Sequence, residues 1–273
     1  MKIYFDRIRQ HRPLIHCITN PVTVNDCANL LLAAGASPTM AHHPSEVEEI
    51  TAGCHALVCN LGATGDYEAM VRAALEAHRK GHPIVVDPVG AGGSAFRREY
   101  FWRLAGRVQL SCIRGNAAEI AALSENHATV TGVDVGEYAH KNVYTDACLL
   151  AERTGAVVIA SGVTDTITDG TEVYLVQNGD EWMSRITGTG CMSSALLGAY
   201  LAEVKREERT EKPAACAEAV AVMGICGELA AAECRQQGWG TMTFRDRMID
   251  RMSLLAEADI RKYCRIEKSS LKK

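Results

Sequence analysis

The sequence predicts an α/β fold with a mostly parallel central sheet flanked by helices. Only 5% of the residues are aromatic whereas 47% are hydrophobic, which favours helices packed closely on a buried sheet over an all-β sandwich. Short apolar runs alternate with segments of helical pattern from one end of the chain to the other. No Pro/Gly/Ser-rich linker interrupts this alternation, so we expect a single domain over residues 1–273.

The first half of the chain is predicted to begin with helices. Asn20 followed by Pro21 is typical of a helix cap and first turn, and Gly35 is typical of a helix end. A second helix is expected to begin at Pro44. A strand, a helix and a strand then follow, which is the order of a parallel sheet. These segments are 56–61, 67–80 and 84–87.

The second half is predicted to extend the sheet and then to become helical. Further strands are expected at 109–114 and 156–160. Asp169-Gly170 indicates a type I′ hairpin between two more strands, so we expect an antiparallel pair at one edge of the sheet. Only helices are expected after Gly188. The two hairpin strands are 164–168 and 173–177.

Composition and charge exclude several classes of protein. The 33 acidic and 29 basic side chains give a net charge of −4, so no broad basic face for nucleic acid is expected. The 11 cysteines are odd in number and scattered, which indicates a reducing cytoplasm rather than a disulfide framework. The charged segment 1–12 does not resemble a signal peptide. No run reaches the roughly 20 apolar residues of a membrane span.

The segment Thr187-Gly188-Thr189-Gly190-Cys191 predicts a glycine-rich entrance to an apolar helix. Glycines let the backbone approach a ligand closely, and the first-turn N–H groups of a helix attract anions. A phosphate would fit this site. A tight loop without a ligand would use the same residues, and this segment alone does not separate the two readings.

Charged side chains follow two neighbouring predicted strands. Asp87 stands at a strand's carboxyl end, where it suits Mg²⁺, a positioned water or a simple Asx turn. Asn116 and Glu119 fit a reciprocal helix cap, and Arg114 beside them fits a phosphate. An anion cradle, two carboxylates and an arginine are the parts that phosphoryl transfer requires. The sequence contains no Walker motif.

Five ordered blocks carry a family resemblance. They are His16-Cys17-Ile18-Thr19-Asn20, Gly35-Ala36-Ser37-Pro38 with Met40-Ala41-His42, Val86-Asp87-Pro88-Val89-Gly90-Ala91, Ile113-Arg114-Gly115-Asn116-Ala117-Ala118-Glu119 and Gly188-Thr189-Gly190-Cys191-Met192. The segment 240–244 adds a Gly-Thr-Phe block with extra residues. Together the blocks resemble the hydroxyethylthiazole kinase family of the ribokinase-like superfamily, over nearly the whole chain.

The resemblance implies a three-layer ribokinase-like fold and an enzyme of thiamine salvage. Such an enzyme phosphorylates the hydroxyl of 4-methyl-5-(2-hydroxyethyl)thiazole with ATP and Mg²⁺. The resemblance further implies a cytoplasmic homotrimer whose active sites lie between subunits. No nucleic acid or membrane partner is expected.

The resemblance also assigns roles to individual residues. Met40 and Gly188 contact the thiazole alcohol, Arg114 and Ser161 contact ATP, Asp87 and Glu119 attend Mg²⁺, and Gly188, Gly190 and Cys191 form the catalytic turn. Cys191 replaces the aspartate base of the superfamily. Pro21, where the family often has an aromatic residue, and Ser161, where it has threonine, depart from the pattern. Asn25 is a further candidate thiazole contact, with a surface or capping role as its alternative.

Cys191 is also predicted to be the reactive cysteine. A thiol at a helix N-terminus has its pKa lowered from about 8.5. Two other functions stay open: an ATP-dependent dehydratase, which normally has aspartate at this position, and a non-catalytic nucleotide-binding regulator. His42 and His43 are expected at a surface or substrate loop rather than at a metal. Core positions are expected at Cys17, Cys27, Cys59, Cys226, Met248, Met252 and Leu255.

Overall fold

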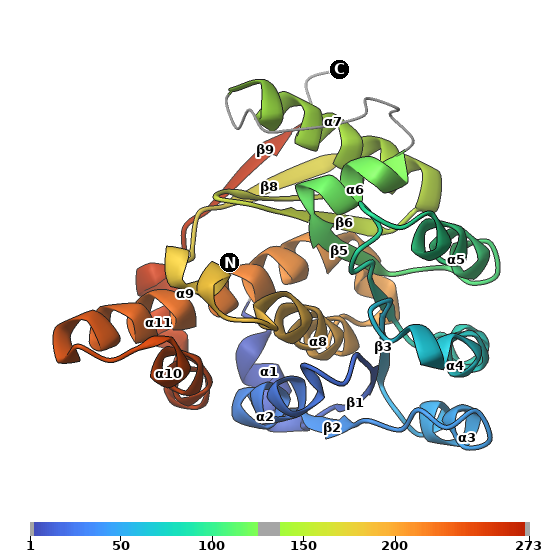
Figure 1. Ribbon diagram of the computed structural model, residues 1–273, viewed down its shortest axis with the longest axis horizontal. Helices are drawn as coiled ribbons and strands as arrows, with labels where there is room; N and C mark the ends of the chain where they lie inside the picture. Colours follow the sequence, from blue (N-terminus) through green and yellow to red (C-terminus); the bar gives the residue numbers. More distant parts are fainter. Residues whose placement is uncertain (1–2, 125–136, 271–273) are drawn as a thin grey trace.

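A computed structural model describes residues 3–124 and 137–270 of the protein. Within these residues nine strands form one sheet in the order β2-β1-β3-β4-β5-β6-β7-β8-β9, with helices on both faces (Figure 1). The strands are β1 Leu14–Ile18, β2 Ser37–Thr39, β3 Ala56–Asn60, β4 Ile84–Asp87, β5 Cys112–Asn116, β6 Val157–Ser161, β7 Asp165–Thr168, β8 Glu172–Val176 and β9 Ile266–Ser270.

The sheet is parallel from β2 to β6 and antiparallel from β6 to β9. This arrangement confirms the predicted α/β fold with antiparallel strands at one edge. Strands β3 and β4 are buried along their whole length, because helices cover both of their faces. Continuous apolar runs such as 84–86 are typical of parallel strands in that position.

Two hydrophobic cores lie on opposite faces of the sheet. One face is covered by α1 Phe5–His11, α2 Val24–Ala34, α8 Thr189–Ala202, α9 Lys212–Gln237, α10 Thr241–Leu254 and α11 Glu257–Tyr263. The other is covered by α3 Val47–Ala52, α4 Tyr67–Lys80, α5 Ala95–Ala105, α6 Ala117–Ser124 and α7 Glu137–Thr154. Short 3₁₀ turns are η1 Thr64–Asp66, η2 Glu181–Arg185 and η3 Arg206–Glu211.

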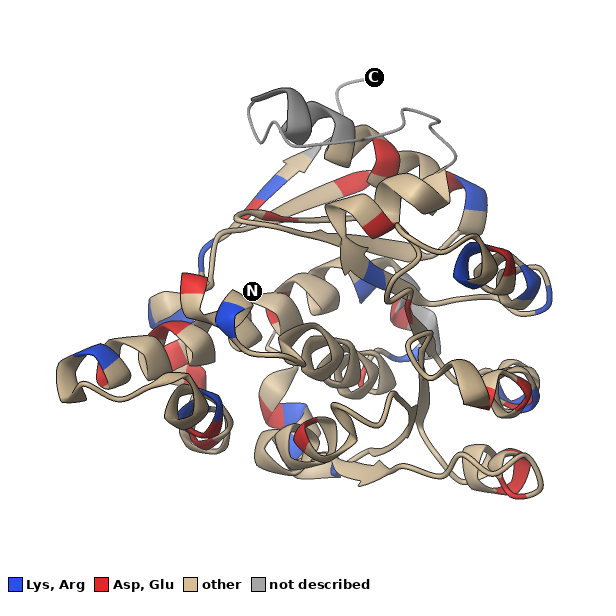
Figure 2. Cartoon of the chain, in the orientation of Figure 1, with Lys and Arg blue, Asp and Glu red and all other residues tan. Residues whose placement is uncertain are grey.

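Helices α8 and α9 form the interior of the first core. Helix α8 has no charged residue along its length, whereas α4, α5 and α10 carry many (Figure 2). Helix α9 is long and apolar enough to cross a membrane, and it is the one such helix in the described part of the chain. Most of its apolar stretch is buried inside the protein, as expected of a core helix. The predicted core cysteines, methionines and Leu255 are all buried, which confirms that expectation.

The first predicted helix starts later than its sequence signal indicates. Helix α2 begins at Val24 rather than at Pro21, although it ends at Gly35 as predicted. The Oδ1 atom of Asn20 accepts the backbone N–H of Val22 at 3.1 Å, so Asn20 closes a turn instead of capping a helix. Helix α3 likewise begins at Val47, three residues after Pro44.

Two predictions for the antiparallel edge are wrong. The β7–β8 connection has three residues, and Gly170 alone among them has a positive φ (87°), whereas a type I′ turn requires two such residues. The carboxylate of Asp169 instead accepts backbone N–H groups of Thr171 and Glu172 at 2.8 and 2.9 Å. The chain after Gly188 is not wholly helical, because β9 pairs with β8 and forms the edge.

A buried carboxylate joins the N-terminal helix to the core. Glu218 of α9 accepts the backbone N–H groups of Tyr4 and Phe5 at 3.0 and 3.2 Å, and the hydroxyl of Tyr200 donates to it at 3.3 Å. Burial raises the pKa of Glu218 from 4.5 to about 7, although these hydrogen bonds act in the opposite direction. The fold therefore favours the protonated acid.

We predict that Glu218 makes the protein less stable as the pH rises. The protonated acid stabilises the fold fully below pH 4.5, and this contribution is lost as the pH passes about 7. The loss amounts to about 3 kcal/mol, the equivalent of the pKa shift. Urea unfolding of wild type and Glu218→Gln between pH 4.5 and 8 would measure it. The variant's stability is expected to fall less steeply, and parallel profiles would contradict the prediction.

Candidate active site

Polar residues gather where the parallel strands end. Because these strands share one direction, their carboxyl ends meet at one edge of the sheet, the usual ligand edge of open α/β sheets. Strand β3 ends at Asn60, β4 at Asp87, β5 at Asn116 and β6 at Ser161. Helix α8 brings Cys191 from its first turn to Asn60.

The start of α8 is a close approach of backbone to neighbouring side chains. Gly188 has φ 92°, and a Cβ there would lie 3.0 Å from Cγ2 of Thr23. A Cβ on Gly190 would collide with the guanidinium of Arg114. No side chain caps the helix. The predicted glycine-rich entrance is therefore present, and its backbone N–H groups suit an anion.

Two carboxamides hold the thiol of Cys191. The Nδ2 atom of Asn60 donates to Sγ at 3.1 Å, and that of Asn20 donates at 3.5 Å. Each amide is oriented by a backbone group, because Oδ1 of Asn60 accepts the N–H of Gly62 at 2.9 Å and Oδ1 of Asn20 accepts the N–H of Val22. The two NH₂ groups must therefore face the sulfur.

The same cluster surrounds Asp87. Its Oδ2 atom accepts Asn60 Nδ2 and Ser194 Oγ, both at 3.0 Å. Burial raises the pKa of Asp87 to about 6, the charge of Arg114 opposes this rise, and the charge of Glu119 adds to it. Both of the hydrogen bonds from Asn60 and Ser194 are to Oδ2, and the thiol of Cys191 lies close enough to the carboxylate to lower its pKa.

The prediction that the pKa of Cys191 is lowered is wrong. Burial and the charge of Asp87 raise the pKa of Cys191, and hydrogen bonds from Asn20 and Asn60 do not compensate. Desolvation of a partly buried sulfur beside a carboxylate favours the neutral thiol. Cys191 is therefore a neutral thiol at pH 7 and is not a ready base in the free protein.

Arg114 carries a charge that no group of the described residues neutralises directly. In residues 3–124 and 137–270 its guanidinium has no ion pair or hydrogen bond, although it lies close enough to lower the pKa of both Asp87 and Asp165. It is partly buried against Gly190. Ser161 ends the adjacent strand, and its Oγ donates to the carbonyl of Gly115 at 3.2 Å. An unpaired guanidinium beside a helix start suits a phosphate.

Glu119 is a helix cap that also faces Asp87. Its N–H donates to Asn116 Oδ1 at 2.9 Å, while its two oxygens accept the N–H groups of Asn116 and Gly90 at 2.8 Å each. The described residues contain no cluster of three or more His, Cys, Asp or Glu side chains suited to a metal. A cation here would have Asp87 and Glu119 as its carboxylates, with other ligands from water or phosphate, as Mg²⁺ prefers.

The remaining predicted residues are placed differently. Met40 follows β2 at the same sheet edge and is partly buried, and its loop is tied to β1 by a 2.8 Å hydrogen bond between His16 Nε2 and the carbonyl of Ala41. Asn25 does not join the cluster, since it is exposed on α2 and accepts Asn29 Nδ2 at 2.9 Å. His42 and His43 are exposed.

Sequence reasoning missed three members of the cluster. Asn60 had a usable signal, a polar residue ending a buried strand just before Gly62. Thr23 and Ser194 had none, because small polar residues are common in helix starts and in helices of small residues. Asn20 was noticed only as a cap.

Comparison with known proteins identifies close relatives. The model of the hydroxyethylthiazole kinase family matches residues 5–258. A hydroxyethylthiazole kinase of Desulfovibrio desulfuricans is 43% identical, over 92% of each chain. The structure of the Pyrococcus horikoshii hydroxyethylthiazole kinase superposes with a TM-score of 0.85 at 33% identity, covering 98% of each chain. A ribokinase-like superfamily protein from Enterococcus faecalis shares the fold, with a TM-score of 0.59 at 14% identity over 92% of this chain and 87% of that one.

The contact between Gly190 and Arg114 predicts the effect of one added methyl group. Gly190→Ala is expected to displace the guanidinium, which is the flexible end of its side chain, without harming a helix that favours alanine. ATP is the nucleotide expected from the sequence, and its Kd should rise about tenfold, as for one lost charge-assisted hydrogen bond. Isothermal titration calorimetry with wild type, Gly190→Ala and Arg114→Ala would measure the Kd of ATP.

Gly53→Ala is the matched control, because its added Cβ would meet only Ile50 O at 3.7 Å. It should leave the Kd of ATP unchanged. An unchanged Kd for Gly190→Ala would place the nucleotide away from this turn.

Proposed function

The chain belongs to the hydroxyethylthiazole kinase family, and we propose that it transfers the γ-phosphoryl group of ATP to the hydroxyl of 4-methyl-5-(2-hydroxyethyl)thiazole in thiamine salvage. The observation that carries this proposal is the unpaired Arg114 beside the uncapped start of α8, next to the buried Asp87–Asn60–Cys191 cluster. It combines a phosphate site with polar groups for an alcohol. We further propose that residues 1–273 form one domain and that the enzyme is cytoplasmic, which suits its free cysteines.

The proposed roles divide between the two substrates. Arg114 and Ser161 would hold ATP from β5 and β6, and Met40 and Gly188 would contact the thiazole alcohol. Backbone N–H groups of residues 188–191 would stabilise the charge of the moving phosphoryl group. Phosphoryl transfer passes through a loose transition state that needs little help from a base. The neutral thiol of Cys191 is therefore proposed to orient the alcohol rather than to deprotonate it.

Conversion of the thiazole alcohol tests the function directly. Incubation with ATP and Mg²⁺ should give the phosphate ester, detected by mass spectrometry. Because Cys191 is a neutral thiol, Cys191→Ala should slow turnover by less than the about 10²-fold typical of a lost general base, and Cys191→Asp should stay active. A larger loss in Cys191→Ala would make the thiol the base. If wild type forms no ester, the remaining functions are a dehydratase and a regulatory nucleotide-binding protein.

Asp87 and Glu119 are the proposed holders of Mg²⁺. Two features support this: Asn60 and Ser194 both donate to Oδ2 of Asp87 rather than to Oδ1, and the negative charge of Glu119 raises the pKa of Asp87. A bound Mg²⁺ would relieve the repulsion between the two carboxylates and neutralise phosphate charge. Asp87→Asn is expected to weaken Mn²⁺ binding to the ATP complex about tenfold, measured by electron paramagnetic resonance. The matched control is Glu172→Gln on β8, and equal Mn²⁺ affinity in Asp87→Asn would refute the assignment.

We also propose a homotrimer with active sites between subunits. Strand β2 is the last strand at its end of the sheet, beside the Met40 loop. The exposed face of α2 next to it carries the uncharged residues Asn25, Asn29 and Leu32, and Val22 lies in the turn before the helix. Val22 and Leu32 are 70% and 57% exposed. A second copy that covers this face would bury apolar surface and complete the site around Met40 and Gly188.

One substitution tests this interface. Leu32→Glu should shift the sedimentation coefficient from trimer to monomer and reduce activity, because it places a charge in the proposed contact. Leu75→Glu is the control: Leu75 is 43% exposed on α4, on the other face of the sheet. A wild-type monomer with full specific activity would exclude the shared site.

A further inference from the structure

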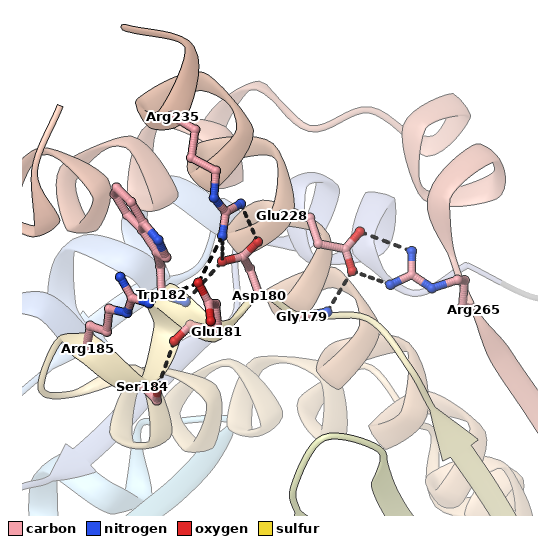
Figure 3. A network of polar contacts seen from close by, with 9 residues as sticks. All are labelled: Gly179, Asp180, Glu181, Trp182, Ser184, Arg185, Glu228, Arg235 and Arg265. Carbon is pink, nitrogen blue, oxygen red and sulfur yellow. Dashed lines mark hydrogen bonds and ion pairs between the residues drawn. The ribbon is translucent and has the colours of Figure 1, made fainter. Parts of the chain in front are cut away.

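The segment 177–187, which leads from β8 to the catalytic turn, lies along α9 (Figure 3). It touches one face of that helix, at Gly224, Gly227, Glu228 and Arg235, because positions i, i+3, i+4 and i+11 of a helix share a face. Two of these contacts are close approaches. A Cβ on Gly224 would lie 2.5 Å from the carbonyl of Asn178, and a Cβ on Gly227 would collide with the sulfur of Met183.

Two ion pairs hold the start of the segment. Arg235 of α9 donates to both oxygens of Asp180 at 2.7 and 2.8 Å. Glu228 accepts the N–H of Gly179 at 2.6 Å and pairs with Arg265, which also donates to the carbonyl of Gln177 at 2.7 Å. Figure 3 shows that the two pairs meet the segment at the neighbouring residues Gly179 and Asp180. Bidentate pairs of this type fix direction as well as distance.

Asp180 links Arg235 to the 3₁₀ turn η2. Its Oδ1 atom accepts the N–H of Trp182 at 3.0 Å, so the same carboxylate caps η2 and binds Arg235. Burial alone would raise the pKa of Asp180, but the hydrogen bonds from Arg235 and Trp182 lower it below its ordinary value. The carboxylate is therefore charged at neutral pH. Trp182 packs edge-on against Phe244, with ring centres 5.7 Å apart, and lies 5.4 Å from the guanidinium of Arg235.

The turn η2 connects directly to α8. The carbonyl of Met183 accepts Thr189 Oγ1, from the first residue of the helix, at 3.1 Å. Gly188 lies between these two residues in a left-handed conformation and contacts Thr23 closely. The position of Gly188 is thus set by η2 on one side and by α8 on the other.

We propose that Arg235 is a positioning residue for the acceptor alcohol: it holds Asp180, which caps η2, and so fixes Gly188 where the alcohol binds. This inference rests on the proposed function for its kinetic part. Arg114 and Ser161 on β5 and β6 make no contact with this segment among the described interactions. Arg235 therefore acts on Gly188 and the alcohol, while Arg114 and Ser161, the proposed contacts of ATP, are held independently of it by β5 and β6.

A role in stability alone would predict a different result. The guanidinium of Arg235 is 44% exposed, and ion pairs at such positions contribute little to global stability. A purely structural loss would lower the fraction of active enzyme and leave both KM values unchanged. Loss of positioning should raise the KM of the acceptor and leave the KM of ATP unchanged.

Arg235→Ala and Arg235→Lys provide the kinetic test. Arg235→Ala is expected to raise the KM of the thiazole alcohol about five- to tenfold, with the KM of ATP constant, as for a small displacement of a binding group. Arg235→Lys keeps the charge without the bidentate geometry and should lie between wild type and Arg235→Ala. The control is Arg251→Ala, which breaks a 2.7 Å pair with Glu233 of α9 and does not touch the segment.

Hydrogen exchange supplies a readout that does not depend on activity. In the substrate-free protein, amides of residues 181–189 should exchange faster in Arg235→Ala than in wild type and Arg251→Ala, while the rest of α8 stays protected. Equal exchange in this segment, or faster exchange with an unchanged acceptor KM, would overturn the proposal. If Arg235→Ala does not fold, Arg235→Lys decides by the same measurements. If wild type does not phosphorylate the alcohol, the proposed function fails, and exchange still tells whether Arg235 holds Gly188.

Discussion

The close contact between α8 and the sheet is the constraint on which the site depends. Gly198 stands in the middle of α8, where glycine destabilises a helix by about 1 kcal/mol relative to alanine. A Cβ there would lie 2.7 Å from Val58 Cγ2 and 3.1 Å from Ile15 Cγ2. Contact with β1 and β3 therefore fixes the position of α8 on the sheet. That position in turn brings Cys191 to Asn60, at the end of β3.

At that point the protein buries an acid and a thiol together, and it meets the cost with oriented amides. Asn60 donates one hydrogen to Asp87 and the other to Cys191, so a single side chain satisfies both groups. The cost of burial remains visible, because the pKa values of Asp87 and Cys191 both lie above their ordinary values. A cation entering this edge would meet a carboxylate that gains from neutralisation, and phosphate groups would meet Arg114, which has no ion pair within the part of the chain that the structure describes.

Sequence patterns predicted those parts of the fold whose cause is local. Strand β4 and helix α4 have the predicted bounds, because an unbroken apolar run and an amphipathic segment ended by a glycine define them without help from the rest of the chain. The start of α2 could not be predicted in the same way, since the side chain of Asn20 is taken up by a turn and by a distant thiol. The segment 266–270 has no clear apolar alternation, and it becomes a strand only because β8 offers a free edge.

The same distinction between local and tertiary causes explains which properties of the site could be predicted. Motifs placed Asp87, Arg114 and Cys191 at one edge, because the carboxyl ends of parallel strands must meet there. They did not reveal the raised pKa of Cys191, which depends on burial beside Asp87, a residue more than 100 positions away. The sequence thus locates the residues of the site, whereas their pKa values depend on neighbours that only the folded chain brings together.

The two halves of the proposed site differ in how they are held. The nucleotide half rests on β5 and β6, inside the sheet, where backbone pairing fixes Arg114 opposite Ile159 and Asn116 opposite Ser161. The alcohol half rests on a segment outside the sheet that is held by side chains of α9 and by Arg265. Changes to side chains such as Arg235 or Trp182 can therefore shift Gly188 without disturbing the strands. In the proposed site, the position of Arg114 thus depends on backbone pairing, whereas the position of Gly188 depends on side-chain contacts.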